Sequence, residues 1–215
     1  MRTGRIKALL SIAAVLFMCT MFNCNAQAKM NAKKHPTVYD SSVAHCMALN
    51  EYTERMRKAG GGKLTLKKGT YRFQYSVCIP SNVTVVFEDG VVIENIFDTK
   101  AHIKPATAMW QLVPKNMTYK NKAIGKYNGT SNAKMIAKGK VVFDMKYIKG
   151  LSIIAVHCKN IEISGITFKG MNGNHYIEVN GAKNVKINKC KFNKAKKGSP
   201  QKAYVKEAIN IDMAD

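Results

Sequence analysis

Residues 159–168 read KNIEISGITF and residues 183–192 read KNVKINKCKF, so the same pattern returns after 24 residues. Self-similarity at a fixed interval of about 20 to 50 residues is typical of repeat architectures. Each copy contains two short stretches of alternating apolar and polar residues, and residues 176–179 form a third. Three short strands in this interval predict one coil of a parallel β-helix, because a β-sandwich has no reason to repeat in this way.

The alternation predicts which side chains face the interior, because successive side chains of a strand point to opposite faces. The inward positions of both copies are apolar: Ile161, Ile163, Ile166 and Phe168, then Val185, Ile187, Cys190 and Phe192. We expect each to stack on its equivalent, about 4.8 Å away along the axis. Asn160 falls over Asn184 at a turn, where amide side chains in register predict a ladder of hydrogen bonds. On the outer face, Glu162 falls over Lys186 as a weak exposed pair.

Upstream of the repeat, the pattern predicts a helix that covers the first coil. Ser41 or Ser42 is a suitable N-cap, and the helix runs to about Lys58 before three glycines at 60–62 end it. Its loose apolar face consists of Val43, Met47, Leu49, Tyr52 and Met56. The capping segment as a whole is residues 41–59.

Short strands with turns between them follow this helix. They are predicted at residues 63–67, 77–80, 83–88 and 90–94, and again at 141–145 and 150–158, with a turn at 68–71. The stretch 95–139 is rich in Lys, Asn and Gly and is predicted to be a long loop over one lateral face. Functional grooves are often built from such loops.

The first 28 residues have the order of a secretory signal peptide. A basic start precedes an apolar stretch at 8–22, and Ala26-Gln27-Ala28 is a small-x-small cleavage site. A membrane anchor is the alternative, but the apolar run is short for a span of about 20 residues. A lipoprotein signal at Cys24 lacks the small residues expected before it. We therefore expect a secreted or cell-surface protein, with no membrane span after cleavage and a polar leader at 29–40.

Charge points to polyanionic partners. The formal net charge is +22, and removing Arg2, Arg5 and Lys7 with the signal peptide leaves +19, because residues 1–28 contain no acidic residue. This excess favours acidic polysaccharide, cell-wall polymer, anionic membrane surface or nucleic acid. An exported protein meets glycans and wall polymers, and no compact aromatic and basic nucleic-acid motif is present. We expect an acidic polysaccharide or cell-wall polymer as partner, no nucleic acid, and a monomer; a charged, solvated surface is the alternative.

Four cysteines remain after cleavage: Cys46, Cys78, Cys158 and Cys190. None is spaced as CxxC, which argues against a zinc site. Export would permit disulfides, but a mature chain of this length can bury a core without them. Unpaired core thiols are the interpretation we favour.

Two segments carry a resemblance to a known family. Residues 59–64 (AGGGKL) and 68–71 (KGTY) resemble the opening of the pectate-lyase-like β-helix superfamily. Residues 160–212 resemble its bacterial right-handed β-helix repeat proteins, including NHYIEV (174–179) and EAINID (207–212). The resemblance implies an all-β fold, a right-handed single-stranded parallel β-helix. That superfamily includes lyases, glycoside hydrolases, esterases, epimerases, phage depolymerases and non-catalytic surface proteins, so the fold does not fix the reaction.

The last predicted strand, 207–212, is followed by no polar cap. An uncapped solenoid exposes apolar interior and unpaired strand edges. We therefore expect the β-helix domain, 29–215, to be incomplete at its C-terminus, with residues 63–215 forming its first coils. The Asn-Thr-Asp, paired-Asp and His-Gly motifs of polygalacturonases are absent from the given residues, as is a convincing calcium-pectate-lyase signature.

A candidate site emerges when Ile177 is aligned with Ile209. His175 then lies beside Glu207, Glu178 beside Asn210 and Asn180 beside Asp212. The outward parity of the last two pairs predicts a polar patch two coils deep, with His175 and Tyr176 at its edge. Residues 194–206 form an inserted loop that is expected to wall the patch.

Such a patch suits two reactions. In a glycoside hydrolase, Glu178 and Asp212 would flank the scissile bond as acid and as base or nucleophile. In a uronate lyase, His175 or Tyr176 would be the base or acid, and lysines or a carboxylate-bound Ca²⁺ would stabilise the enolate. The sequence does not otherwise determine a cofactor. The alternatives are that His175 only bonds a turn and that the two carboxylates are simply solvated.

Several further residues are candidates for substrate binding. Asn180, Asn210 and Glu207 belong to the patch, and Trp110 and Tyr127 have rings that can stack on sugars; Trp110 beside Met109 and Leu112 also suits the core. Two functions remain open. The first is a secreted enzyme acting on acidic polysaccharide, and the second is a non-catalytic cell-surface β-helix that binds glycan or wall polymer.

Overall fold

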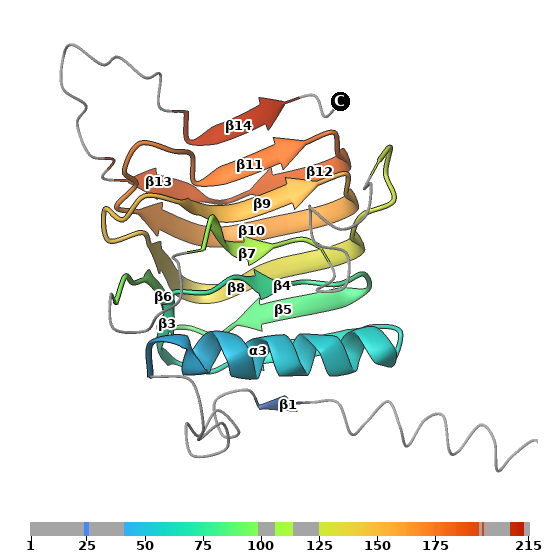
Figure 1. Ribbon diagram of the computed structural model, residues 1–215, viewed down its shortest axis with the longest axis horizontal. Coiled ribbons are helices and arrows are strands. Elements are labelled where there is room, and N and C mark those ends of the chain that lie inside the picture. Colours follow the sequence, from blue (N-terminus) through green and yellow to red (C-terminus); the bar gives the residue numbers. More distant parts are fainter. Residues whose placement is uncertain are drawn as a thin grey trace, which may run out of the picture.

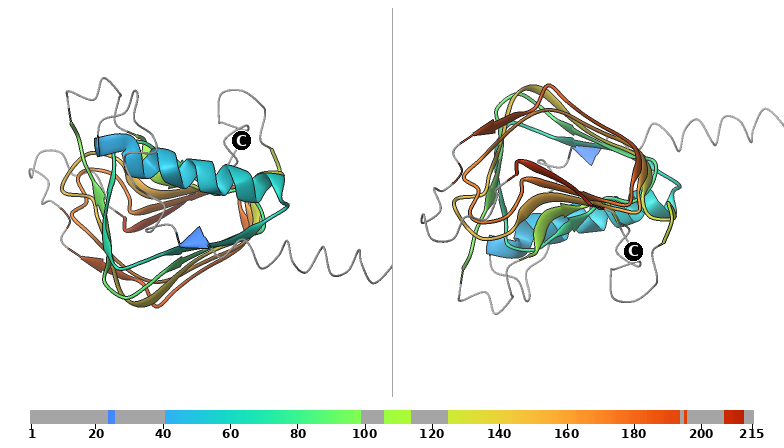
Figure 2. Two further views of the ribbon diagram at one scale, coloured as in Figure 1. Left: turned by 90° about the horizontal axis from the view of Figure 1, so that it is seen from below. Right: turned by 90° about the horizontal axis from the view of Figure 1, so that it is seen from above.

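The computed structural model describes residues 24–25, 41–98, 106–113, 125–193, 195 and 207–212. Within these residues, one helix lies at the end of a stack of parallel strands (Figure 1). Figure 2 views the stack from its two ends and shows successive coils lying over one another. The structure thus confirms parallel β-strands with one N-terminal helix.

Each coil contributes strands to up to three stacks. The first stack contains β2 (Gly62–Leu66), β5 (Val83–Phe87), the first part of β8 (Ser131–Asp144), the first part of β10 (Lys159–Lys169) and β12 (Lys183–Asn188). The second contains β3 (Gly69–Phe73), β6 (Val91–Asn95), the remainder of β8 and β10, and β13 (Lys191–Asn193). The third contains β4 (Val77–Cys78), β7 (Ala108–Gln111), β9 (Leu151–Val156), β11 (Ile177–Asn180) and β14 (Ile209–Asp212).

The two similar segments of the sequence lie in register on adjacent strands. Lys159 pairs with Lys183, Ile163 with Ile187, and Phe168 with Phe192. The inward side chains of β10 are buried, and those of the next coil pack against the same core. Because the inward residues superimpose, each coil buries the apolar surface of its neighbour, which is the dominant favourable term in such a stack.

An aromatic column runs through this core. The ring centroids are 5.3 Å apart for Phe87 and Phe143, 5.4 Å for Phe143 and Phe168, and 5.2 Å for Phe168 and Phe192. Edge-to-face and offset contacts at such distances each add about 0.5–1.5 kcal/mol beyond burial. The column therefore stabilises coil-to-coil register as well as the core.

The predicted asparagine ladder is confirmed and is longer than expected. Asn184 Nδ2 donates to Asn160 Oδ1 (3.0 Å), Asn160 to Asn132 (2.9 Å), and Asn132 to Asn82 (3.1 Å), whose own Nδ2 donates to the Gly60 carbonyl. All four asparagines have φ between 54° and 60°. Asparagine tolerates this left-handed conformation better than other non-glycine residues, so the ladder marks the same corner of every coil.

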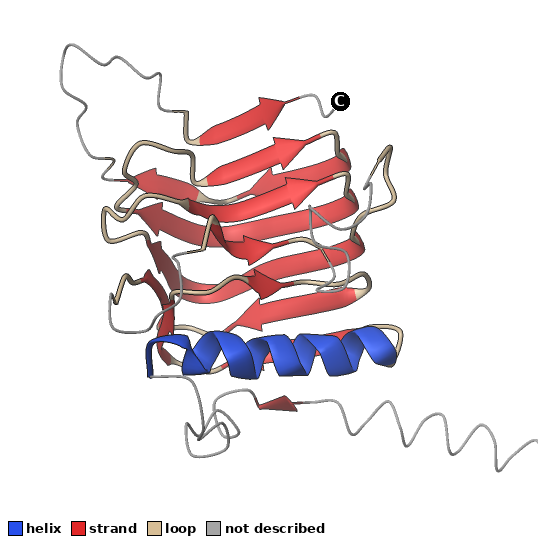
Figure 3. Ribbon diagram, in the orientation of Figure 1, coloured by secondary structure: helices blue, strands red, loops and turns tan. Residues whose placement is uncertain are grey.

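The helix α3 (Ser41–Lys58) begins and ends where it was predicted, and it closes the first coil (Figure 3). Leu49 and Met56 are buried, but Met47 is only half-buried and Cys46 takes its place in the core. After the helix, Gly61 has a φ of 143°, and an added Cβ would lie 2.5 Å from the Asn82 carbonyl oxygen. Only glycine fits this approach of two backbones.

Polar side chains of α3 satisfy the open strand edges beneath them. Asn50 Nδ2 donates to the Ser76 carbonyl (2.8 Å), and its Oδ1 accepts from the Cys78 amide (2.9 Å). His45 Nδ1 accepts from the Arg72 amide (2.9 Å). Because an unpaired edge is a template for further pairing, these bonds end the second and third stacks at this side. The short β1 (Cys24–Asn25) pairs with β2, and cleavage after residue 28 would remove it.

Two segments that were expected to lack strands contain them. Within 95–139, β7 joins the third stack, and β8 begins at Ser131 rather than near residue 141. Ala133 and Met135 are fully buried, so the strand continues through a stretch in which lysines hide a weak alternation. Residues 68–71 were expected to form a turn, but 69–73 form β3, with Tyr71 and Phe73 inward.

The expected pair between Glu162 and Lys186 is present as a register neighbour only. Glu162 lies opposite Lys186 in β12, but its carboxylate pairs with Lys134 Nζ of the preceding coil at 3.4 Å. Lys134 is exposed and Glu162 is partly exposed, so this pair contributes little. The helix in the described part of the chain is not long and apolar enough to cross a membrane.

Candidate functional site

The polar patch predicted on the third stack is present. We define the β11/β14 patch as Glu178, Asn180, Asn210 and Asp212. Glu178 lies in register with Asn210, and Asn180 with Asp212. Asn180 Nδ2 donates to Glu178 Oε1 at 2.8 Å, which turns the Glu178 carboxylate along the strand toward Asn180. The two carboxylates of the patch are therefore diagonal neighbours on adjacent strands.

Strand geometry sets the spacing of this diagonal. Two residues along a strand advance about 6.7 Å and neighbouring strands lie about 4.8 Å apart, so the Cα atoms of Glu178 and Asp212 are separated by about 8 Å. Glu178 is half-buried and Asp212 is exposed. The Oδ1 atom of Asn180, which lies between them, is buried without a hydrogen-bond partner. A bound hydroxyl group or a protonated carboxyl would satisfy this acceptor.

His175 lies next to Glu207, as the alignment predicted. Its Nδ1 faces the Glu207 carbonyl oxygen at 3.2 Å, and a carbonyl can only accept, so Nδ1 carries the proton. In the neutral ring, Nε2 is then free to accept a proton. His175 therefore makes the turn hydrogen bond that was considered as the alternative to a catalytic role. The same bond also fixes the ring tautomer that a general base would need.

Tyr176 does not lie at the edge of the patch, and that expectation is corrected. The residue is 2% exposed and packs against Phe168 and Phe192. Its hydroxyl donates to the Asn193 carbonyl at 2.6 Å and accepts from the Met171 amide at 3.2 Å. Burial raises the pKa of this hydroxyl. The chain bends at this corner, so strand parity fails one residue before β11 begins.

The two aromatic residues predicted to stack on sugars, Trp110 and Tyr127, differ in burial. Trp110 is 0% exposed, with its ring centroid 5.0 Å from that of Phe73 and 5.7 Å from that of Phe87, so it belongs to the core. Its position in β7 turns it inward. Tyr127 is 45% exposed, and Lys183 Nζ lies 5.9 Å from its ring centroid. Of these two residues, Tyr127 is the one whose ring is accessible to a ligand.

His157 connects the Tyr127 turn to the patch, and sequence reasoning missed it. His157 is buried, its Nδ1 lies 2.9 Å from the Lys126 carbonyl oxygen, and its amide donates to the Asn180 carbonyl. The residue has a φ of 50°, in the left-handed region that histidine, like asparagine and aspartate, adopts more often than other non-glycine residues. Tyr127 is thus held beyond the C-terminal end of β11, while His175 lies before its N-terminal end.

The patch ends after two coils. Beneath Glu178 lies Ile154, and beneath Asn180 lies Val156. Ile154 is half-buried and Val156 is buried. The polar groups therefore border an apolar floor on the preceding coil, an arrangement that suits a ligand with both hydroxyl groups and apolar ring faces.

The described residues offer no ready metal centre. No three His, Cys, Asp or Glu side chains within them come together in a way that could hold an ion. Calcium requires six to eight oxygen ligands, more than the β11/β14 patch provides. Cys46, Cys158 and Cys190 are free thiols, and burial raises the pKa of Cys46 and of Cys158 to about 12. These buried thiols are inert, as expected for core residues.

Comparison with known proteins bears on the fold. No family model matches the sequence, and no curated protein matches it. The fold resembles that of an iota-carrageenase. The family GH82 enzyme from A. fortis, solved in the absence of chloride ions, superimposes with a TM-score of 0.58 at 18% identity. The match covers 82% of this chain and 39% of that one, so this chain spans well under half of that enzyme's length.

Two further solved structures are more distant. One is a Parabacteroides merdae protein provisionally named a glycosyl hydrolase, with 17% identity, a TM-score of 0.49 and coverage of 82% of this chain and 91% of that one. The other is an iota-carrageenase in complex with iota-carrageenan fragments, with 18% identity, a TM-score of 0.49 and coverage of 74% and 35%. At these identities the likeness concerns the fold alone.

Proposed function

We propose that this protein is a secreted glycoside hydrolase that cleaves an anionic polysaccharide. The fold is proposed to be a right-handed single-stranded parallel β-helix, residues 29–215, exported by the signal peptide at 1–28 and acting as a monomer. The observation that carries the proposal is the pair of carboxylates, Glu178 and Asp212, on adjacent coils of one outer face. The likeness of the fold to that of a family GH82 iota-carrageenase supports the same class.

The spacing of the pair suggests its chemistry. Inverting glycosidases hold their two carboxyl groups about 6.5–9.5 Å apart to admit a water molecule, and retaining enzymes hold them about 5–5.5 Å apart. Cα atoms about 8 Å apart allow the two outward carboxyl groups to lie at the inverting distance, and that arrangement is the one we propose. Glu178, the less exposed carboxyl group, is proposed as the general acid, and Asp212 as the base that activates water.

Other groups would position the substrate. Asn180 and Asn210 lie beside the two carboxylates in the patch, and Glu207 holds His175 at its N-terminal edge. Tyr127 offers an exposed ring beyond the opposite edge. The net charge, +22 for the whole chain and +19 after removal of residues 1–28, favours an anionic polysaccharide, because it raises the local concentration of polyanions at the surface. Sulfated galactan such as iota-carrageenan is the first substrate to test, given the name of the structural neighbour.

Two other functions are supported by single observations. A uronate lyase is supported by His175, whose Nδ1–H bond leaves Nε2 as a possible base. A non-catalytic glycan-binding protein of the cell surface is supported by the exposure of Asp212 and Glu207, because catalytic carboxyl groups are often partly desolvated. The experiment below separates all three.

The test incubates the full-length protein with iota-carrageenan, pectate, alginate and glycosaminoglycans. New reducing ends without absorbance from unsaturated uronates would support a hydrolase, and a rise in that absorbance would support a lyase. Binding without either product would support the non-catalytic function. In a hydrolase, proton NMR of the first product should show inversion at the anomeric carbon.

Variants then test the assignment. Glu178→Gln and Asp212→Asn should each lower the rate of cleavage by about 10²- to 10⁴-fold, the usual contribution of general acid–base catalysis. Glu162→Gln is the matched control, because Glu162 is an outward carboxylate on another stack. Wild-type rates in both active-site variants would overturn the assignment, even if cleavage itself were observed.

A further inference from the structure

Three exposed aromatic side chains occur at one corner of the coils, where the second stack passes to the third. Tyr75 is 39% exposed, Phe97 55% and Tyr147 47%. We call these three residues the aromatic corner. Within the described part of the chain, none of them has a ring partner, whereas the core rings are all paired. Large apolar side chains that gather on a surface usually mark a binding site.

The register of the strands places these rings on successive coils. Phe73 pairs with Asn95, so Tyr75 and Phe97 each follow a paired position by two residues. Glu94 pairs with Asp144, which brings Tyr147 to the equivalent place one coil further. Neighbouring strands lie about 4.8 Å apart, so the corner forms a short row parallel to the axis of the stack.

Phe97 is held by an anchored backbone. The buried Gln74 side chain donates to the Asp98 carbonyl (2.9 Å) and accepts from the Asp98 amide (2.8 Å). On the other side, the Ile96 amide donates to the Phe73 carbonyl. The residues on both sides of Phe97 are thus fixed while its ring stays in solvent. A fixed, exposed ring loses little conformational entropy when it binds a ligand.

Tyr147 is held in a strained turn. Lys146 and Tyr147 have φ values of 52° and 58°, and such left-handed conformations are costly for non-glycine residues. The Tyr147 amide donates to the Gly170 carbonyl (2.7 Å), and its carbonyl accepts from Asn172 Nδ2 (2.8 Å). Strain that the surrounding structure maintains is a common feature of ligand-binding positions. Asn172 also joins this turn to the loop that leads to His175.

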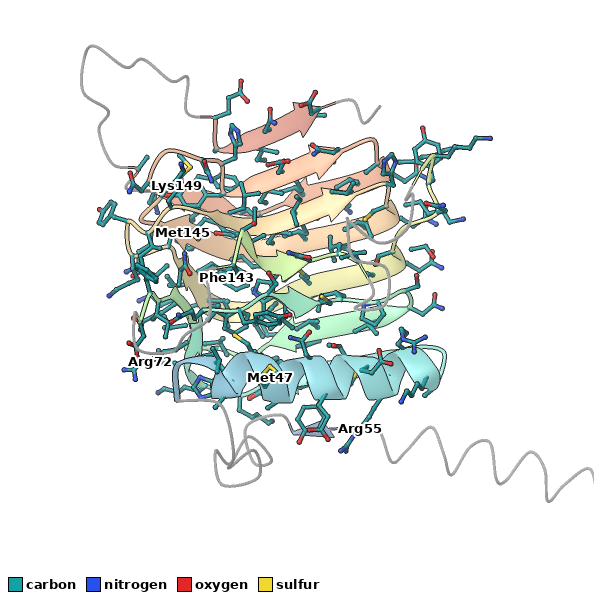
Figure 4. All side chains as sticks on the ribbon, viewed as in Figure 1. Met47, Arg55, Arg72, Phe143, Met145 and Lys149 are labelled. Carbon is teal, nitrogen blue, oxygen red and sulfur yellow. The ribbon has the colours of Figure 1, made fainter. Side chains whose placement is uncertain are left out.

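The surface around the rings is cationic. Arg72 and Lys146 both lie within 4.0 Å of the less exposed Glu94 carboxylate, at 3.9 and 3.7 Å, and Lys169 Nζ lies 2.9 Å from the mostly buried Asp144. The cations are therefore outermost, with their acidic partners beneath. Arg72 and the exposed Lys149 lie on the same side of the molecule (Figure 4). Asp98 is the other acidic group at this corner.

We propose that the aromatic corner is an extended binding surface for an anionic polysaccharide chain that runs parallel to the axis of the stack. Apolar faces of the sugar rings stack on Tyr75, Phe97 and Tyr147, and the acidic substituents contact Arg72, Lys146 and Lys149. The polysaccharide continues past Asn172 toward His175 and the β11/β14 patch. This inference rests on the proposed function for its direction, whereas binding at the corner is independent of cleavage.

Binding is tested by calorimetry with short and long oligosaccharides of iota-carrageenan and of galacturonate. The parent protein and all variants carry Glu178→Gln, which prevents cleavage. Tyr147→Asn is the first variant, because asparagine keeps the left-handed turn. Loss of a ring is expected to weaken binding of long oligosaccharides about three- to tenfold, from about 0.5–1.5 kcal/mol per aromatic contact. Tyr147→Phe should bind as the parent protein does, and Phe97→Ala should resemble Tyr147→Asn.

Charge is tested in the same way. Lys149→Ala should weaken binding of the long oligosaccharides, whereas Lys138→Ala, an exposed lysine at another corner, should not. Short oligosaccharides should be bound equally by all variants. Unchanged binding of long oligosaccharides by Tyr147→Asn and Phe97→Ala together would overturn the inference. Normal binding at the corner without any cleavage would instead overturn the proposed function and leave the corner site standing.

Discussion

At the scale of single residues, polar side chains hold the backbone where the coils turn. Each asparagine of the ladder has a left-handed φ and passes a hydrogen bond to the coil before it, so the side chain stabilises the turn and the coil contact together. His45 has a similar role at the helix, where its ring accepts from the Arg72 amide. These contacts involve single atoms, so substitutions can separate their contributions.

The ladder can be tested at Asn160, which has a partner on both sides. Asn160→Gly keeps the left-handed turn but removes two hydrogen bonds, and should lower the free energy of unfolding by about 1–2 kcal/mol. Asn160→Ala should cost about 1 kcal/mol more, because alanine is strained at a φ of 56°. Urea denaturation measures both. Asn184→Gly, with one ladder bond to Asn160, is the milder comparison, and equal losses at the two sites would contradict a ladder.

Acid should weaken the contact of His45. Burial, and then the charge of Arg72, lower the pKa of His45 below its usual 6.5. The unfolded chain therefore binds the proton first, so this contribution is complete above pH 6.5 and is lost as the pH falls through the lower folded value. Chemical denaturation at pH 7.5 and at several acidic values should show the decline. His45→Gln cannot take up the proton and should have a smaller slope; an unchanged slope would contradict this origin.

At the scale of elements, the helix α3 acts as the final strand partner of the first coil. Asn50 replaces the backbone groups of a missing strand, because its amide both donates to Ser76 and accepts from Cys78. The apolar residues of the helix seal the core beneath the same coil. A helix that only covered the core would leave these buried backbone groups unpaired, at a cost of about 1–3 kcal/mol each.

Replacement of Asn50 by leucine tests this capping role. Asn50→Leu fits an apolar side chain of similar size but removes the two hydrogen bonds that Asn50 makes to the Ser76 carbonyl and the Cys78 amide. The free energy of unfolding should fall by about 2–4 kcal/mol, and the Cys78 amide should exchange its hydrogen faster. Glu51→Gln, on the exposed side of the same helical turn, is the control and should change little. Protection of the Cys78 amide in Asn50→Leu would argue against the role.

At the scale of the whole molecule, charge and shape favour long polyanions. The coils stack along one axis, the aromatic corner lies where the second stack passes to the third, and the β11/β14 patch lies on the third stack. A net charge of +22 spread over exposed lysines attracts a polymer over a longer range than any single contact. Such attraction between solvated charges is screened by salt, with a Debye length of about 10 Å at 0.1 M.

Binding should therefore depend strongly on ionic strength. Raising sodium chloride from about 0.1 M to about 1 M shortens the Debye length to about 3 Å and should weaken binding of iota-carrageenan or pectate severalfold. A neutral polysaccharide such as agarose should show no such trend. Affinity electrophoresis at several salt concentrations gives both results. If binding of the anionic polymers did not depend on salt, electrostatic attraction would not contribute to their recognition as proposed.

The amino-acid sequence determined most of the repeat and of the patch. The spacing between 159 and 183, the helix from Ser41 to Lys58, and the alignment of Ile177 with Ile209 were all predictable, because inward parity is a property of residues two apart in the chain. Two strands can therefore be aligned by their inward apolar residues alone. The Glu178 and Asp212 pair follows from that match.

Only the tertiary structure decided what lies at the corners. Tyr176 and Trp110 turn inward, β7 and the start of β8 fill a segment that was expected to loop, and the three rings of the aromatic corner come together from positions 75, 97 and 147. These rings are separated by unequal lengths of chain, since coils differ in the loops they carry. A repeat of fixed length reveals the register of two coils only where their loops have equal lengths. Contacts between coils with loops of different length depend on the folded path of the backbone.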